Sequence, residues 1–262
     1  MLALITGASS GMGRDMARIL AKKGYDLILV ARRRERMLEL KKELGTNITV
    51  IPMDLSIEEN NYKLFEKVKN KKIDILINNA GFGLFGEFSK TEIDTELKMI
   101  DLNIKSYHIL TKLFLQDFIK RDSGYILNVC SSAGFMAGPG MATYYATKNY
   151  VTKLTMAINE ELRVAKSHVT ICALCPGPVA TEFNDVAHGT FAVKEASSYE
   201  VALYAIDKMF QHKMIIVPTV MMKLTLFFNR FAPYCLSLSI AYKIQKRKSK
   251  KIRNSLFFEG MF

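Results

Sequence analysis

The 262-residue sequence predicts an α/β protein in which helices cover both faces of one doubly wound parallel sheet. Short apolar runs alternate along the chain with longer segments whose apolar residues recur at helical spacing. The runs are apolar throughout, which is typical of strands that are buried on both faces. With 49% apolar and 24% charged residues, the chain has the composition of a soluble globular domain with one large core.

The elements follow one another as strand, helix, strand along most of the chain. The predicted strands are residues 2–6, 26–31, 48–53, 74–77, 125–130, 168–174 and 214–218. The first helix is indicated by Met12, Met16, Ile19 and Leu20, and further helices are expected near 57–70, 91–120 and 142–166. Right-handed crossovers between parallel strands then give one Rossmann-type domain over residues 1–220, followed by a helical extension at 221–262.

A glycine-rich segment, TGASSGMG at residues 6–13, lies between the first strand and the helix that follows it. Glycine can adopt positive φ and lets the backbone approach a pyrophosphate, while the helix N-terminus supplies free N–H groups. Because the strand before and the helix after are both expected, the segment predicts a dinucleotide site. The predicted contacts are Gly7, Ser9, Ser10, Gly11, Met12 and Gly13.

The end of the second strand indicates which dinucleotide is bound. An acid there would accept hydrogen bonds from the adenosine ribose 2′-OH, but the strand ends at Ala31 and continues into Arg32, Arg33 and Arg34. Guanidinium groups suit a phosphate monoester. We therefore expect NADP(H) in preference to NAD(H), with Arg32 or Arg33 as the clamp. The alternative is a solvated basic helix start, a theme that Arg36 continues.

Tyr144 and Lys148 are four residues apart in the helix predicted near 142–166, so their side chains share one face. A nearby ammonium favours the phenolate, and together with the nicotinamide cation it would lower the tyrosine pKa from its usual value of about 10. Tyr144 would then suit proton transfer to or from a substrate oxygen. This spacing is common in helices, however, so the assignment depends on other motifs.

Those motifs occur along most of the chain. They are TGASSGMG at 6–13, Asp54, NNAG at 78–81, Asn103, SSAG at 131–134, YYATK at 144–148 and PGPVAT at 176–181. In this order they resemble the short-chain dehydrogenase/reductase family over roughly residues 1–220. The resemblance implies a nicotinamide-dependent oxidoreductase that transfers a hydride between C4 of the cofactor and a carbonyl carbon or secondary alcohol. It also implies a homo-oligomer, either a dimer or a tetramer.

The resemblance assigns catalytic roles to four side chains. Tyr144 would be the general acid in the reducing direction, and Ser131, thirteen residues before it, would hydrogen-bond the substrate carbonyl in preference to Ser132. Lys148 would hold the nicotinamide ribose hydroxyls and lower the tyrosine pKa. Asn103 would fix a water in a proton relay, unless its amide simply satisfies backbone groups.

Further cofactor contacts are implied along the same cleft. Asp54 would meet the adenine, and the other implied contacts are Leu55, Asn79, Ala80, Gly81, Pro176, Gly177, Val179 and Thr181. Asn79 has the same alternative as Asn103, which is to satisfy backbone groups.

The substrate is expected to meet residues 182–212, a segment that varies with substrate in the family and often closes over it. Its apolar side chains are Phe183, Val186, Phe191, Val193 and Tyr204, which favour a lipophilic substrate such as a steroid or a fatty-acyl ketone. Ordinary packing explains the same side chains. His188 receives no catalytic role.

The C-terminal extension is apolar over 220–242 and then strongly basic. Seven of the twelve net positive charges lie between Lys243 and Arg253, a stretch without an acid, which leaves +5 for the rest of the chain. Lys223 and Pro233 make the apolar run a poor membrane-spanning helix. Two interpretations remain: an amphipathic helical pair on an anionic membrane surface, or packing against the sheet or a partner subunit.

Other functions are less favoured by the sequence. The basic cluster lacks interleaved aromatic residues, so nucleic-acid binding is not expected. A non-catalytic dinucleotide-binding sensor or scaffold need not keep Ser131, Tyr144 and Lys148 together. Cys172 and Cys175 lie on opposite faces of a strand, which favours packing thiols over a metal site, and we expect a reduced, cytoplasmic environment.

Overall fold

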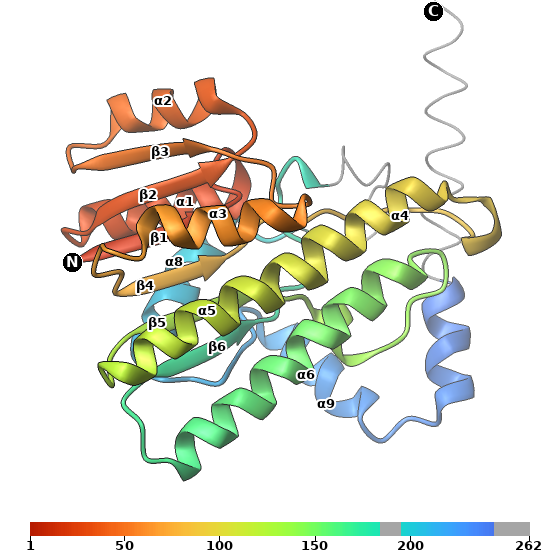
Figure 1. Ribbon diagram of the computed structural model, residues 1–262. Helices are drawn as coiled ribbons and strands as arrows, with labels where there is room; N and C mark the ends of the chain where they lie inside the picture. Colours follow the sequence, from red (N-terminus) through yellow and green to blue (C-terminus); the bar gives the residue numbers. More distant parts are fainter. Residues whose placement is uncertain (184–194, 244–262) are drawn as a thin grey trace, which may run out of the picture.

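The computed structural model describes residues 1–183 and 195–243, which form one seven-stranded parallel sheet with helices on both faces (Figure 1). The strands are β1 (Leu2–Thr6), β2 (Asp26–Ala31), β3 (Ile48–Pro52), β4 (Ile75–Asn78), β5 (Tyr125–Val129), β6 (Thr170–Leu174) and β7 (Ile215–Ile216). Their order is β3-β2-β1-β4-β5-β6-β7, which confirms the doubly wound sheet. The order reverses between β1 and β4, where ligands of such sheets bind at the carboxyl ends of the strands.

The helices were predicted in most, but not all, of their positions. They are α1 (Gly11–Lys22), α2 (Arg34–Glu43), α3 (Glu58–Val68), α4 (Ile93–Ile100), α5 (Tyr107–Lys120), α6 (Ala142–Val164), α8 (Ser198–Phe210) and α9 (Val220–Asn229). Short turns add η1 (Phe88–Lys90), η2 (Asp101–Ser106) and η3 (Ser132–Phe135). The expected helix over 91–120 is thus α4 and α5 joined by η2, a π-helical turn.

The sheet separates two large apolar clusters. Ala3 and Ile5 pack on one face with α1 and α8, whereas Leu4 between them packs on the other with α3 and α5. In Figure 1, α3, α5 and α6 lie in front of the sheet, with α1 and α8 behind it. Cys172 and Cys175 belong to different clusters and are fully buried, as expected for packing thiols on opposite faces.

Helix α8 lies in the second half of the segment that was expected to meet the substrate. Its buried residues, Val201, Ala205, Ile206 and Met209, recur at helical spacing and pack against α1 in the core. Tyr204 lies on the same helix, where its hydroxyl is 3.2 Å from Lys223 Nζ. Residues 198–210 are therefore a structural helix. Val186, His188, Phe191 and Val193 lie outside the described residues.

The C-terminal extension is helical where the structure describes it, in α9 and in residues 234–243. Met222 and Leu226 pack against the cluster that contains Val217 and Cys175, so one face of α9 rests on the domain. Among the described residues, no helix is both long enough and apolar enough to cross a membrane.

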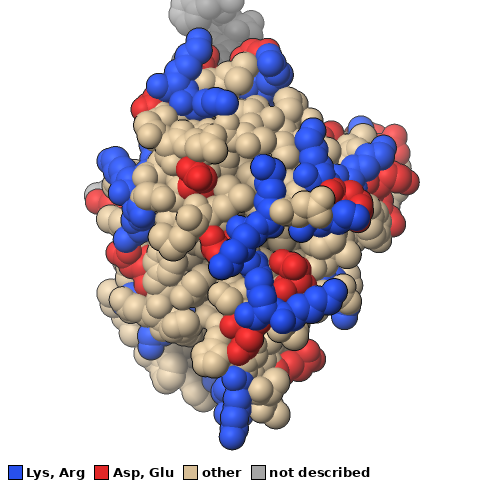
Figure 2. All heavy atoms as spheres, turned by 60° about the vertical axis from the view of Figure 1, so that its left-hand side comes forward, with Lys and Arg blue, Asp and Glu red and all other residues tan. Residues whose placement is uncertain are grey.

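The face of the molecule shown in Figure 2 carries charges of both signs. Lys and Arg side chains are interspersed there with Asp and Glu, as on an ordinary solvated surface.

Candidate active site

The glycine-rich loop has the backbone geometry that the sequence predicts. It leaves β1 with Gly7 at φ +65°, and α1 begins at Gly11, at φ +51°. A Cβ on Gly7 would lie 2.8 Å from Ala80 Cα, and one on Gly13 would lie 2.5 Å from the Gly7 carbonyl oxygen. Side chains at Gly7 and Gly13 would therefore push the loop away from β4 and α1. The close backbone approach needed for a pyrophosphate is in place.

Thr6 and Asn79 fix this loop to the end of β4. Thr6 Oγ1 accepts hydrogen bonds from the backbone N–H groups of Asn79 (2.9 Å) and Ala80 (3.0 Å). The Asn79 amide donates in turn to the carbonyl oxygens of Thr6 (3.0 Å) and Gly7 (3.2 Å). Asn79 therefore satisfies backbone groups and shapes the cleft wall. Thr6 opens the motif, but sequence reasoning did not assign it a role.

A cleft runs along the carboxyl ends of β1, β2 and β4. Thirteen of the predicted cofactor residues line it: Gly7, Ser9, Ser10, Gly11, Met12, Arg32, Arg33, Asp54, Leu55, Asn79, Ala80, Gly81 and Thr181. Phe183, which the sequence assigned to the substrate segment, also lines the cleft. So do six residues that the sequence did not indicate as contacts: Val30, Ala31, Met53, Phe82, Leu102 and Glu182. Val30 and Ala31 end β2 and Met53 directly follows β3, so the topology could have found these three. Gly13 instead packs beneath the loop.

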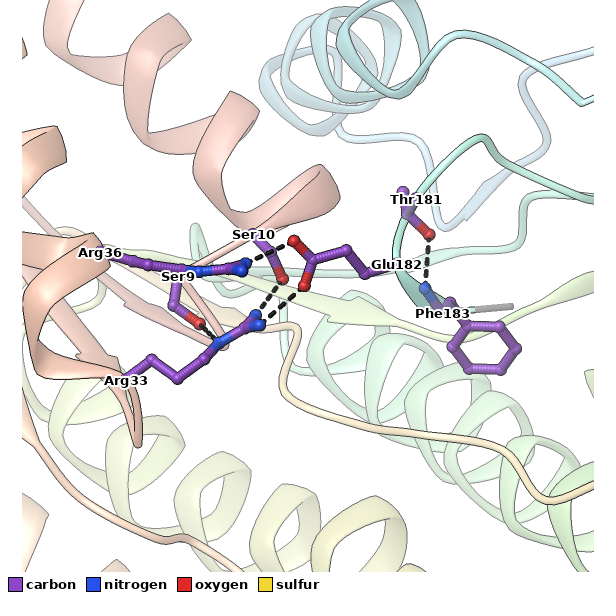
Figure 3. A network of polar contacts seen from close by, with 7 residues as sticks. All are labelled: Ser9, Ser10, Arg33, Arg36, Thr181, Glu182 and Phe183. Carbon is purple, nitrogen blue, oxygen red and sulfur yellow. Dashed lines mark hydrogen bonds and ion pairs between the residues drawn. The ribbon is translucent and has the colours of Figure 1, made fainter. Parts of the chain in front are cut away.

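The arginines after β2 meet a carboxylate from the opposite side of the cleft (Figure 3). Arg33 Nη1 donates to Glu182 at 2.7 Å, and Arg36 donates to the other oxygen of the same carboxylate. Arg33 also donates to Ser10 Oγ at 2.7 Å and to Ser9 Oγ at 3.3 Å. Hydrogen bonds from Arg33, and then from Arg36, lower the pKa of Glu182. Arg36 is thus part of this cluster as well as of the basic start of α2.

The predicted catalytic side chains come together between β5 and the first two turns of α6. Ser131 lies two residues after the end of β5 and caps η3, its Oγ accepting from Ala133 N at 3.1 Å. Tyr144 is 9% exposed and shares a side-chain hydrogen bond with Ser131. Lys148 is 4% exposed and donates from Nζ to the Val129 carbonyl at 2.9 Å. Its Nζ lies 5.9 Å from the centroid of the Tyr144 ring.

Burial determines the electrostatics of this group in the protein by itself. Burial raises the pKa of Tyr144, and the hydrogen bond with Ser131 offsets only part of that increase. The expected lowering requires the nicotinamide cation as well as Lys148, so it stays a prediction for the protein with its cofactor bound. Burial also lowers the pKa of Lys148 to about 8. At neutral pH the site thus holds a neutral phenol beside an ammonium, the protonation state of a general acid.

Asn103 sits on the π-helical turn η2 and is completely buried. Its amide nitrogen donates to the Phe82 carbonyl at 2.9 Å and to Thr147 Oγ1 at 3.2 Å, and its oxygen accepts from Phe82 N at 3.2 Å. A Cβ on Gly81 would lie 2.9 Å from that oxygen. Asn103 therefore joins the segment after β4 to α6, as the backbone-satisfying interpretation expects.

The PGPVAT segment follows β6 and contributes unevenly to the cleft. The Pro176 carbonyl accepts from Ser132 N at 2.8 Å, and a Cβ on Gly177 would lie 2.7 Å from Met222 of α9. Val179 is buried and pairs with Ala196. Thr181 is the member of this set that lines the cleft, and its methyl group would lie 3.0 Å from a Cβ on Gly11.

Apolar side chains surround the tyrosine. Phe183 lies with its ring centroid 5.4 Å from that of Tyr144, and it packs over Gly83. The same cluster contains Met99, Ala133, Met141, Phe82, Leu84, Phe85 and Tyr145. Phe82, Leu84 and Phe85 follow NNAG in a loop without periodicity, which is why the sequence did not reveal them. Among the described residues, no three or more His, Cys, Asp or Glu side chains could together hold a metal ion.

Comparison with known proteins identifies the family. The family model described as short chain dehydrogenase matches residues 1–189. The chain belongs to the short-chain dehydrogenase/reductase family. It is an NAD(P)-dependent oxidoreductase that transfers a hydride, and the non-catalytic sensor is not favoured.

Relatives of this short-chain dehydrogenase/reductase span most of both chains. Dehydrogenase/reductase SDR family member 11 of Bos taurus is 35% identical over 210 residues, which cover 76% of this chain and 82% of the relative. NADP-dependent 3-hydroxy acid dehydrogenase YdfG of Escherichia coli K12 is 35% identical over 192 residues, covering 71% and 76%.

Solved structures of the family share the fold. A Sphingobium yanoikuyae short-chain dehydrogenase in complex with NADPH has a TM-score of 0.78 at 28% identity, covering 84% of this chain and 88% of the other. A bulky-bulky ketone specific alcohol dehydrogenase from Comamonas testosteroni has a TM-score of 0.75 at 28% identity, covering 87% and 91%. A Burkholderia phymatum member in complex with NAD, at 22% identity and a TM-score of 0.79, covers 86% and 91% and shows the fold alone.

Proposed function

We propose that this oxidoreductase uses NADP(H) to interconvert a lipophilic ketone and its secondary alcohol. The observation that carries the proposal is the group at the end of β5, where Tyr144 shares a hydrogen bond with Ser131, lies near Lys148 and is enclosed by apolar side chains. The cleft runs from Phe183, whose ring centroid lies 5.4 Å from that of Tyr144, to the arginines after β2. The residues along it fit a dinucleotide, because the glycine loop and the first residues of α1 line the cleft and offer backbone N–H groups to a pyrophosphate.

The chain's own groups suit carbonyl reduction. When bound, the nicotinamide supplies the hydride that the carbonyl carbon accepts. Ser131 Oγ donates a hydrogen bond to the carbonyl oxygen, and the neutral phenol of Tyr144 gives that oxygen its proton. The ammonium of Lys148 holds the ribose hydroxyls and stabilises the phenolate that is left behind. Asn103 holds the segment after β4 against α6 through Phe82 and Thr147, and it receives no direct role in proton transfer. Oxidation of an alcohol runs through the same groups in reverse.

The preference for NADP(H) is supported by the arginine cluster. Arg32 and Arg33 line the cleft at the end of β2, which carries Ala31 where an NAD(H)-binding chain would place an acid. Two of the proteins above are named as NADP-dependent or carry NADPH, and one carries NAD. The paired replacement Arg32→Ala and Arg33→Asp should raise the dissociation constant for NADPH far more than that for NADH. An equal effect on both contradicts the preference.

The reaction is tested by following NADPH oxidation over ketosteroids, 3-oxoacyl thioesters, sugars and aromatic ketones. We expect turnover with at least one of the apolar ketones, because the surroundings of Tyr144 are apolar. Tyr144→Phe keeps the ring and removes the proton, so turnover should fall by about 10²–10⁴. Near-unchanged turnover in this variant contradicts the mechanism, and activity restricted to sugars contradicts the substrate class.

The C-terminal extension supports a second proposal, that its exposed face rests on an anionic lipid surface. The outward side chains of α9 and the residues after it include Phe227, Phe228, Phe231 and Tyr234, which are 58–89% exposed. No acid occurs between residues 220 and 258. Anionic lipid attracts such a segment by about 1 kcal/mol per basic residue near the surface.

Flotation with vesicles tests this surface. The full chain should float with phosphatidylserine-containing vesicles and not with pure phosphatidylcholine, and truncation after Tyr242 should weaken binding. Equal binding of the two proteins contradicts the electrostatic attraction. Light scattering without lipid measures the homo-oligomer that the family resemblance implies. If the protein is a dimer and Phe228→Ser makes it a monomer, the apolar face binds a second copy of the chain and not a lipid surface.

A further inference from the structure

Glu182 lines the cleft but has no role in the catalytic scheme. It directly follows Thr181 on the β6 side of the cleft, and its carboxylate reaches across to the arginines that follow β2 (Figure 3). One of its oxygens accepts from Arg33 at 2.7 Å, and the other accepts from Arg36. These residues are 146 and 149 positions from Glu182 in the sequence, so the fold alone brings them together.

A carboxylate that bridges two guanidinium groups has the same chemistry as a phosphate monoester in that position. Both present anionic oxygens to planar N–H donors, and both are acceptors only. Ser9 and Ser10 complete the set, because their hydroxyl oxygens accept from Arg33 at 3.3 and 2.7 Å and hold its guanidinium toward the cleft. Arg33, one of the two arginines expected to bind an adenosine 2′-phosphate, is therefore already engaged by a carboxylate of the chain itself.

We propose that Glu182 is a built-in competitor for the adenosine 2′-phosphate and thereby a determinant of cofactor specificity. The inference rests on the proposed preference for NADP(H). A ribose 2′-OH does not need the guanidinium groups and leaves the carboxylate bridge intact. A 2′-phosphate must displace the carboxylate, which it can do because its charge is close to −2. Glu182 therefore weakens the binding of the phosphorylated cofactor and leaves that of the other unchanged.

The position of Glu182 links the two ends of the site. Phe183 comes next in the chain and lies against the ring of Tyr144, while its backbone N–H donates to Thr181 Oγ1 at 3.3 Å. The carboxylate that meets the adenosine end and the ring that lines the substrate end thus belong to adjacent residues. Displacement of Glu182 by the 2′-phosphate frees this stretch of chain at its arginine end.

The test is a calorimetric titration of Glu182→Gln with two probes that differ only in the phosphate, adenosine 2′,5′-bisphosphate and adenosine 5′-monophosphate. The variant keeps the size of the side chain and removes its charge. We expect the bisphosphate to bind about threefold to tenfold more tightly, the size of effect that one or two half-exposed ion pairs produce, and the monophosphate to bind within about twofold of the unmutated protein.

Glu35→Gln is the matched control. Glu35 lies on α2 near the same arginines, is exposed and pairs only loosely, at 3.8 Å, with Arg34. The Glu35→Gln substitution removes one negative charge near the arginines and leaves the contacts of Arg33 in place. Its effect on the affinity for either probe should therefore be small. An equal gain in the two variants reduces the Glu182 effect to net charge and overturns the proposal.

The remaining outcomes separate the proposal from the function it rests on. If Glu182→Gln binds the bisphosphate more weakly than the unmutated protein or equally well, the carboxylate either orders the arginines or has no effect on binding. Either result overturns the proposal that Glu182 competes with the 2′-phosphate. The NADP(H) preference itself then still stands, provided that Arg33→Ala abolishes the advantage of the bisphosphate over the monophosphate. If the unmutated protein and Arg33→Ala show no such advantage, the preference and the competitor fail together.

Discussion

Replacing Lys148 by Met should stabilise the fold while it disables the site. Lys148 is 4% exposed, and burial lowers its pKa from 10.5 to about 8. At about 1.4 kcal/mol per pH unit, keeping the ammonium charged inside the fold costs about 3 kcal/mol relative to the neutral amine. Methionine has a similar length and carries no charge. The Val129 carbonyl, which accepts from Lys148, would keep its hydrogen bond from the Tyr107 hydroxyl at 3.2 Å.

The sign of this effect depends on pH. Below pH 8 the lysine is charged in both the folded and the unfolded chain, so the folded protein carries the full cost of burial. Between pH 8 and 10.5 the folded protein has lost the proton that the unfolded chain still binds, so its stability rises with pH. We therefore expect Lys148→Met to be more stable than the unmutated protein by about 1–3 kcal/mol at pH 7. This advantage should shrink toward zero as the pH approaches 10.5.

Urea denaturation of both proteins at pH 7 and pH 10 measures the two differences, and NADPH oxidation shows the loss of turnover. Lys153→Met is the control, because Lys153 is exposed on the same helix. Its difference from the unmutated protein should be small and the same at both pH values. A Lys148→Met protein that is less stable at pH 7, or whose advantage is equal at both pH values, refutes the argument that desolvation of Lys148 is a cost to the fold.

Three further outcomes follow from the structure. Gly13→Ala should abolish the fluorescence gain of bound NADPH and lower the melting temperature, because the added Cβ would lie 2.5 Å from the Gly7 carbonyl oxygen; near-normal NADPH binding would contradict this. His168 should titrate above pH 6.5 by NMR, since Asp122 raises its pKa, and Asp122→Asn should move the midpoint down; an unmoved midpoint contradicts the pairing. Phe183→Ala should raise KM for bulky apolar ketones by about tenfold, the effect of losing one apolar contact beside Tyr144; equal losses for small ketones would count against it.

The sequence was sufficient to predict those elements in which a local residue pattern also marks the functional residues. The strand, glycine loop and helix at residues 2–22 were predicted from an apolar run and from the glycines that follow it. At these glycines an added Cβ would clash with neighbouring atoms. Ser131, Tyr144 and Lys148 were found because the resemblance fixes their spacing. Helix α8 was missed, although Val201, Ala205 and Met209 have helical spacing, because its position in the family suggested a substrate segment.

Other features could not be read from the sequence in principle. The bridge from Glu182 to Arg33 joins half-exposed residues 149 positions apart, and neither position carries a periodic signal. The raised pKa of Tyr144 depends on burial by Phe183 and the loop after β4, which only the assembled fold supplies. The features that the residue pattern did not predict thus depend on the tertiary packing of irregular segments.

The π-helical turn at Asp101–Ser106 gives the site an unusual relation to chain length. Such a turn holds one more residue than the α-helix around it, and a single deletion there would let residues 93–120 form one regular helix. That shorter helix would have better hydrogen bonds but would turn α4 by about 100° and remove Asn103 from Phe82. A one-residue deletion in this stretch should therefore give a more regular helix and a site that lacks the Asn103 contact with Phe82.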